Sequence, residues 1–135
     1  MSGDQASISA FVVLLMVALV ALLGLVVDGG RAMTARQSAQ DEVEQAARAG
    51  AGALSVDALR SGQLVLDQQT AVTDAVNFTV QSGHPGRATV SGDTVTVTVS
   101  YGVPTDVLGI VGVSSLPISA TASAVDVDGV TREDQ

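Results

Sequence analysis

The feature that most constrains this chain is an uninterrupted apolar run near its N-terminus. The run extends from Ala10 to Val27 and reads AFVVLLMVALVALLGLVV, without one polar side chain. A helix needs about 20 predominantly apolar residues to cross a hydrocarbon layer of about 30 Å. Preceded by a short flank of residues 1–9 and ended by Asp28, the run therefore predicts a transmembrane helix over residues 10–28.

Two alternatives to a lasting anchor are a cleaved signal peptide and a buried helix of a soluble protein. A signal peptide has a basic n-region and a small-residue cleavage site. Here residues 1–5 contain no basic side chain, and no Ala-x-Ala directly follows the run. A helix that is apolar on every face needs a large core around it, and a chain of 135 residues leaves too little to supply one. We expect a single-pass anchor.

Composition limits the chemistry and the partners of the rest of the chain. A formal net charge of −8 argues against nucleic acid, because binding to phosphates requires clustered Lys or Arg. No Cys is present, so the sequence offers no disulfide and no thiolate nucleophile. The single His84 lies in a Gly/Pro turn at the expected surface, and Asp41, Glu42 and Glu44 spread around a solvated helix instead of converging on a metal. We predict no enzymatic activity, no cofactor and no metal site.

The segment after the span, residues 29–54, has the composition of an Ala-rich juxtamembrane helix, which Gly29-Gly30 is expected to interrupt or bend. A narrow stripe of small apolar side chains recurs along it at spacings of three and four. The stripe consists of Ala32, Ala35, Ala39, Val43, Ala46 and Gly50. This candidate helix-docking face can pack on the protein's own domain or against another helix. On the opposite face, Glu44 and Arg48 are spaced for an ion pair.

Residues 55–127 are predicted to form a small domain that begins with a helix. The helix is expected to start at Ser55 or Asp67 and to end at Val80. A flexible tail over residues 128–135 is expected to follow the domain.

A change of hydrophobic period from helical spacing to two predicts strands in the second half of this domain. A two-residue turn at Gly92-Asp93 places Val90 opposite Val95, on one face of a hairpin. A short helical or loop segment over residues 104–112 and a third strand over residues 116–127 are expected next. The predicted fold class is α+β: an N-terminal transmembrane helix that continues into a juxtamembrane helix, then a small domain with an antiparallel β-sheet.

Two motifs around the end of the span resemble those of a known family. The first is VDGGR over residues 27–31, at the exit of the apolar helix, and the second is DEVEQAARAGA over residues 41–51. Together with Gly3 and the uninterrupted apolar helix, they resemble the TadE/TadG-like family of tight-adherence (Flp) pilus assembly proteins. The resemblance is good as far as residue 55 and only general beyond it.

This resemblance implies a minor pilin-like or pseudopilin-like component of a pilus or a related secretion apparatus. Its partners would be other pilus or secretion-system subunits, in a homo- or hetero-oligomer formed through the N-terminal helix. Processing by a prepilin peptidase would cut the Gly3-Asp4 bond. Such proteins usually carry Glu where this chain has Ile8, which favours the TadG-like, anchored branch over a filament subunit. The membrane-exit motif of Asp28, Gly29, Gly30 and Arg31 is either a simple polar stop or a contact with another membrane protein.

The sequence leaves two alternatives open for the orientation of the chain and two for its function. Arg31 and Arg36 follow the span while only Asp4 and the terminal amine precede it, so the positive-inside bias alone favours a cytoplasmic C-terminus. The family resemblance implies the opposite, a C-terminal domain outside the cytoplasm, and that is the orientation we expect. The alternative function is a membrane-anchored binding or regulatory module unrelated to pili.

Overall fold

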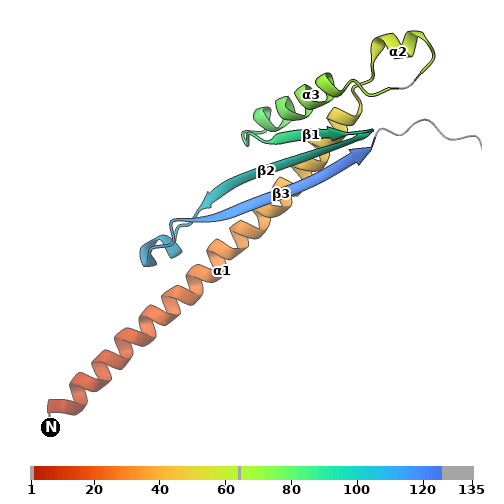
Figure 1. Ribbon diagram of the computed structural model, residues 1–135. Helices are drawn as coiled ribbons and strands as arrows, with labels where there is room; N and C mark the ends of the chain where they lie inside the picture. The colour runs from red at the N-terminus through yellow and green to blue at the C-terminus, as the bar shows by residue number, and fades with distance from the viewer. Residues whose placement is uncertain (1, 64, 126–135) are drawn as a thin grey trace, which may run out of the picture. The chain divides into compact units, whose positions relative to one another are not determined.

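The computed structural model describes residues 2–63 and 65–125 of the chain, and Figure 1 labels the elements. In chain order these are α1 (Ser2–Ala51), α2 (Val56–Arg60), α3 (Gln68–Gln81), β1 (Arg87–Ser91), β2 (Thr94–Pro104), the 3-10 helix η1 (Leu108–Val111) and β3 (Ser115–Val125). A long apolar helix followed by short helices and a three-stranded sheet confirms the predicted α+β class. The predicted tail lies outside the described residues.

The chain forms two compact units. The first contains the residues up to Ala35 together with Gly102–Pro117, and the second contains Arg36–Tyr101 together with residues from Ile118 onward. Three elements, α1, β2 and β3, contribute residues to both units.

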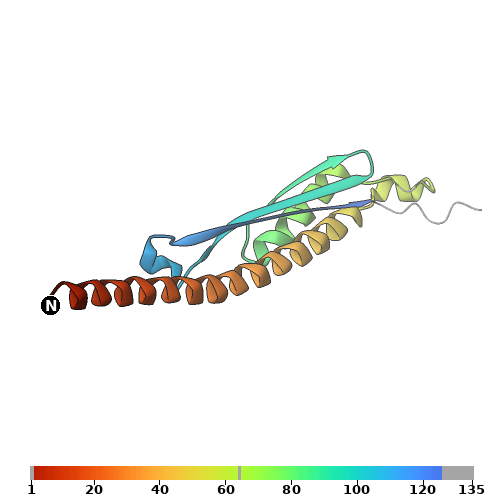
Figure 2. The ribbon, with the colours of Figure 1, turned by 90° about the horizontal axis from the view of Figure 1, so that it is seen from below.

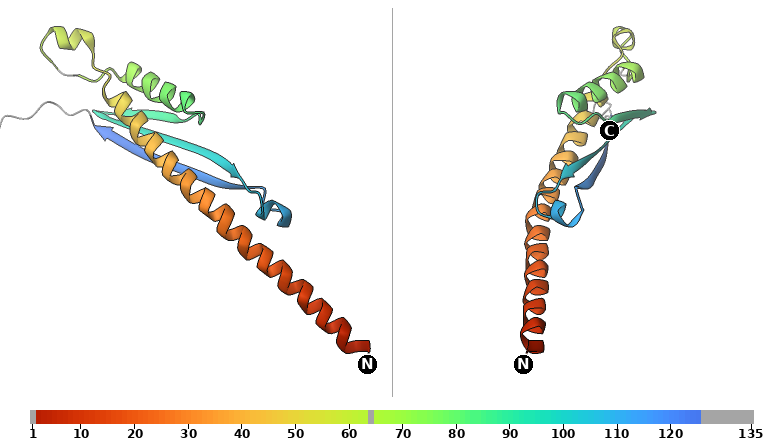
Figure 3. Two further views of the ribbon diagram at one scale, coloured as in Figure 1. Left: turned by 180° about the vertical axis from the view of Figure 1, so that it is seen from behind. Right: turned by 90° about the vertical axis from the view of Figure 1, so that its left-hand side faces the viewer.

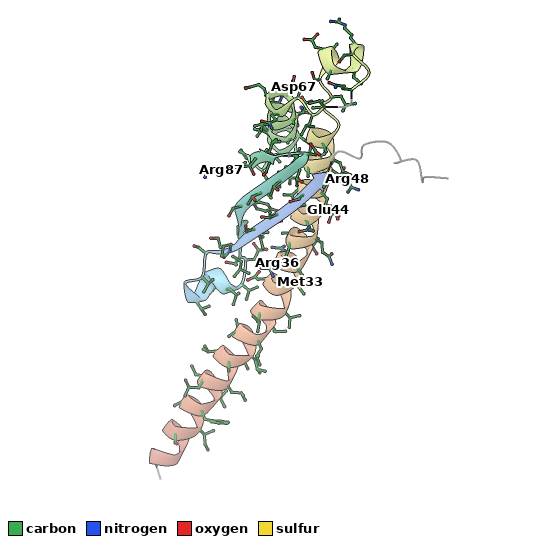
Figure 4. All side chains as sticks on the ribbon, turned by 45° about the vertical axis from the view of Figure 1, so that its right-hand side comes forward. Met33, Arg36, Glu44, Arg48, Asp67 and Arg87 are labelled. Carbon is green, nitrogen blue, oxygen red and sulfur yellow. The ribbon has the colours of Figure 1, made fainter. Side chains whose placement is uncertain are left out.

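In the first unit, the apolar part of α1 is almost entirely uncovered. Phe11, Leu14 and Val26 are 66%, 70% and 73% exposed, and Figure 4 shows side chains that project from both flanks of this part of the helix. A core helix of a soluble protein would instead be enclosed by its own domain. The length and composition of α1 suffice to cross a membrane, as the sequence predicted.

The predicted interruption at Gly29-Gly30 is absent, because α1 continues as one helix through both glycines. Each glycine costs only about 1 kcal/mol relative to Ala in a helix, and the strong helix formers on both sides outweigh that cost. Space is not the reason for glycine here, since an added Cβ would meet nothing within 4 Å at either position. Thr34 Oγ1 donates a further hydrogen bond to the carbonyl oxygen of Gly30 at 3.2 Å.

In the second unit, both predicted helix starts are used, by two different helices. Ser55 is the N-cap of α2, and its side chain accepts a hydrogen bond from the backbone N–H of Ala58. Asp67 is the N-cap of α3, and its side chain accepts from the backbone N–H of Thr70 at 3.1 Å. The sequence therefore located both caps but did not separate the helices.

The β1–β2 hairpin has the predicted register. Val90 pairs with Val95 and Ala88 with Val97, in antiparallel strands. Gly92 opens the turn with a φ of 61°, a conformation that a side chain would strain and that the first residue of a II′ hairpin turn requires.

The sheet has the order β1-β2-β3, and one of its faces covers the core of the second unit. Figure 2 shows α3 and the last part of α1 on the same face of the sheet. Val95, Val97 and Val99 of β2 point into this layer and are at most 1% exposed. On the other face, hydroxyl groups pair across β2 and β3, Thr96 with Ser123 at 2.8 Å and Thr98 with Thr121 at 2.9 Å. These pairs align β2 and β3 in antiparallel register.

Candidate functional site

Asp28, which ends the predicted span, binds the β2–β3 loop, residues 105–114. The residue is 2% exposed. Its Oδ1 accepts a hydrogen bond from the backbone N–H of Asp106 at 3.1 Å, and its Oδ2 accepts from those of Val107 at 3.1 Å and Leu108 at 2.7 Å. Because the first N–H groups of a helix lack partners within the helix, the carboxylate caps η1 from a segment far away in the sequence.

Gly24 lies one helical turn before Asp28 and lets the same loop approach α1 closely. A Cβ added at Gly24 would lie 2.7 Å from Cγ1 of Val107 and 3.5 Å from Cδ2 of Leu108. The first of these distances is too short for two carbon atoms, so only glycine fits without movement of the loop. Figure 3 shows the η1 segment beside α1 from behind. The loop therefore packs on α1 from Gly24 to Asp28.

Arg31 adds an ion pair at the edge of this contact. Its Nη1 donates to Oδ2 of Asp106, the first residue that Asp28 holds. The two side chains are 54% and 62% exposed, so solvent screens the pair and it contributes little to stability. Asp28 and Arg31 of the exit motif thus make contacts within the protein, which the sequence did not reveal. The sequence held only one weak indication of this contact: the single Gly of the apolar run, Gly24, stands four residues before Asp28.

Most of the candidate helix-docking face is covered by the protein itself. Ala39, Val43 and Ala46 are 0% exposed, and a Cβ added at Gly50 would lie 2.7 Å from the carbonyl oxygen of Ala71 in α3. In the folded protein these positions are therefore not available to another helix, which corrects the docking interpretation for this part of the stripe. The remaining two, Ala32 and Ala35, are half-buried.

The predicted ion pair on the opposite face is present. Nη2 of Arg48 lies 3.4 Å from Oε2 of Glu44, and Figure 4 labels both residues on α1. Both are exposed, as expected for a solvated face.

Glu42, in contrast, is not on a solvated face, and His84 is not a free turn residue. The Glu42 side chain is 8% exposed, and its Oε2 lies 2.9 Å from Nδ1 of His84. The His84 ring stacks on Tyr101, with 3.8 Å between ring centroids and an interplanar angle of 13°. The position of Glu42 in the sequence could have indicated its burial. It lies three residues after Ala39 and four before Ala46, on the same helix face as the stripe.

Glu42, His84 and Tyr101 all belong to the second unit, and their contacts change the pKa of Tyr101. Burial raises the pKa of the Tyr101 hydroxyl, and the negative charge of Glu42 raises it further. Oε1 of Glu42 is buried and has no hydrogen-bond partner among the residues that the structure describes. Within residues 2–63 and 65–125, no three His, Asp or Glu side chains are grouped to hold a metal ion.

The processing site predicted from the family resemblance lies at the start of the chain. Gly3 and Asp4 fall in the first turn of α1, and cleavage between them stays a prediction.

Comparison with known proteins bears on the same part of the chain. Residues 6–53 match the family model described as "Putative Flp pilus-assembly TadE/G-like". No curated protein and no solved structure matches the chain. The matched segment contains the apolar span, the Asp28–Arg31 exit motif and the stripe with Glu42. The resemblance to the TadE/TadG-like family is thereby confirmed over residues 6–53, which is about a third of the chain.

Proposed function

We propose that this chain is a non-catalytic, membrane-anchored, minor pilin-like component of the Flp pilus apparatus, with its folded domain outside the cytoplasm. The observation that carries the proposal is that the family match coincides with α1, whose apolar part has almost no cover from the described rest of the chain. Such a helix requires lipid or other apolar helices around it. Assembly with other anchored subunits in the membrane supplies both.

Structural contacts also support a role without catalysis. The polar groups that could carry chemistry are used to hold the fold together. Asp28 accepts hydrogen bonds from three backbone N–H groups of the β2–β3 loop. Glu42 is paired with His84, whose ring stacks on that of Tyr101. A binding component needs a stable shape more than a reactive group, and these contacts supply stability.

The TadG-like branch fits the chain better than a filament subunit. A filament subunit of the prepilin type carries Glu where this chain has Ile8, which is 63% exposed on α1. An apolar residue there suits a helix that stays in lipid. We therefore expect the protein to remain in the membrane as part of the assembly apparatus.

Replacement of the anchor tests the proposal in cells. In a strain that lacks this gene, we expect Flp pili to disappear and the wild-type gene to restore them. A variant with residues 10–23 replaced by an unrelated apolar helical sequence of equal length keeps Gly24 and its packing on the β2–β3 loop. It should insert at normal levels but fail to restore pili, because contacts of the helix with other subunits are lost. Normal piliation of the deletion strain would contradict the proposed function. Restoration of pili by the variant would show that the apolar part of α1 serves only as a membrane anchor.

Reporter fusions test the orientation. Alkaline phosphatase fused to the C-terminus should be active, and a reporter that works only in the cytoplasm should be silent at the same position. The opposite pattern would place the domain in the cytoplasm, where the positive-inside bias alone would put it.

A further inference from the structure

The β2–β3 loop exposes a group of aliphatic side chains that a soluble loop would not. Ile110 is 79% exposed, Val111 55% and Val113 42%. No charged residue occurs from Val107 to Pro117. Loops of soluble domains are usually polar, and adjacent exposed aliphatic residues indicate a surface that contacts another apolar phase.

The place of the loop identifies that phase. Val107 and Leu108 lie against Gly24, which belongs to the apolar run from Ala10 to Val27. Asp28 marks the end of this run and holds the start of η1. Since a helix rises about 1.5 Å per residue, Gly24 lies about 6 Å inside the polar boundary at Asp28. The loop is thus held beside the last turn of the span, at the depth where hydrocarbon meets headgroups.

Many backbone N–H groups of the loop have hydrogen-bond partners within the protein, as an environment with little water requires. Asp28 accepts hydrogen bonds from the N–H groups at the start of η1. Further along, the N–H groups of residues 110, 112 and 113 donate to carbonyl groups within the loop, and Thr105 and Ser114 close it with a backbone hydrogen bond of 3.1 Å. Peptide groups that are bonded internally can enter the interfacial region at little cost, whereas unpaired groups cannot.

From these observations we propose that the β2–β3 loop is a second membrane contact, in which Ile110, Val111 and Val113 enter the acyl-chain boundary of the leaflet next to the folded domain. The partner is the lipid hydrocarbon and not an anionic headgroup, since the inserted residues are uncharged and the chain carries a net charge of −8. The inference rests on the anchoring of α1 in the membrane, which belongs to the proposed function. It holds for either orientation of the domain.

Fluorescence quenching in proteoliposomes tests this proposal. The chain has no cysteine, so Leu14→Cys, Asp93→Cys and Ile110→Cys each place one nitrobenzoxadiazole label on the full protein. The vesicles consist of phosphatidylcholine with a spin-label quencher either near the headgroup or near the bilayer centre. We expect the label at 110 to be quenched mainly by the shallow quencher, the label at 14 mainly by the deep one, and the label in the 92–93 turn by neither.

The outcomes separate the loop from the anchor. Quenching at 14 without quenching at 110 would overturn the membrane contact and leave the loop to a protein partner, while the anchor would stand. Absence of quenching at both positions would overturn the anchor and the loop contact together. A second variant tests whether Asp28 holds the loop at this depth. Asp28→Ala should lower quenching at 110 toward the level of the 92–93 turn and leave quenching at 14 unchanged. Unchanged quenching at 110 in that variant would refute the role of Asp28 in holding the loop at this depth.

Discussion

Gly50→Ala tests how closely α1 packs on α3 and the sheet. The added Cβ would lie 2.7 Å from the carbonyl oxygen of Ala71, 2.9 Å from Cγ1 of Val95 and 3.1 Å from Cβ of Ala75. Two of these distances are shorter than real Cβ contacts, and the shortest involves backbone, which cannot rotate away as a flexible side chain can. One of the two helices would have to shift.

Two opposing effects decide the sign of the change. Ala is favoured over Gly in a helix by about 1 kcal/mol, while overpacking of a filled core costs about 1–3 kcal/mol. Because backbone atoms resist the new methyl group, the upper part of that range applies, and we expect a net loss of about 1–2 kcal/mol. For a domain of 60–100 residues each kcal/mol lowers Tm by about 4–8 °C, so the midpoint should fall by about 5–15 °C.

Thermal unfolding of the full chain in detergent micelles measures this effect. Tyr101 is the only Tyr and the chain has no Trp, so tyrosine emission reports on the second unit alone. Gly29→Ala is the matched control: it is also a helical glycine of α1, but its added Cβ meets nothing within 4 Å. This variant should leave the midpoint of the tyrosine signal unchanged or raise it slightly. A Gly50→Ala protein at least as stable as Gly29→Ala would refute the close packing of α1 on α3.

Three further predictions follow from the polar contacts. Asp28→Asn should speed hydrogen exchange of the three loop amides that Asp28 holds, while Arg31→Gln, which removes only an exposed ion pair, should leave them slow; equal exchange in both variants would contradict the cap. Burial and the charge of Glu42 raise the pKa of Tyr101, so the folded protein holds that proton more tightly than the unfolded chain does. The free energy of unfolding should fall as pH rises above about 10, and a Tyr101→Phe variant with the same fall would refute this source. His84→Ala leaves the buried Glu42 carboxylate without its partner and should cost about 1–3 kcal/mol in denaturant unfolding; the additional change Glu42→Gln should restore part of the loss, and no restoration would show that the stacked ring matters more than the charge.

Local patterns made much of the fold predictable. The alternation around the Gly92-Asp93 turn fixed the pairing of Val90 with Val95, because slippage by one residue would turn the valines to the solvent. The apolar run predicted the span, since only side-chain composition matters for that inference. Helix caps at Ser55 and Asp67 were visible as well, because capping depends on the next three residues.

The contacts that build the site were not predictable, because their partners are distant in the sequence. Asp28 and Asp106 are 78 residues apart, and no periodicity connects a carboxylate to backbone N–H groups of a loop. Glu42 looked like one of several solvated acids, and only its pairing with His84, 42 residues later, explains its burial. Of the two alternatives at Gly29-Gly30, the interruption is wrong. The low helix propensity of two residues was given more weight there than the helix-forming sequence on both sides of them.

The distance in sequence between Asp28 and its partners has a consequence for biosynthesis. The apolar helix and Asp28 leave the ribosome long before the loop that Asp28 holds, since the chain must grow by 78 residues before Asp106 exists. At about 5–20 residues per second this takes roughly 4–16 s. During that interval, in the membrane topology proposed above, the carboxylate would stand at the edge of the bilayer with only water or the insertion machinery to solvate it. The contact at Asp28 can therefore form only after residues 106–108 have been made, and a newly made chain stalled before residue 106 would lack it.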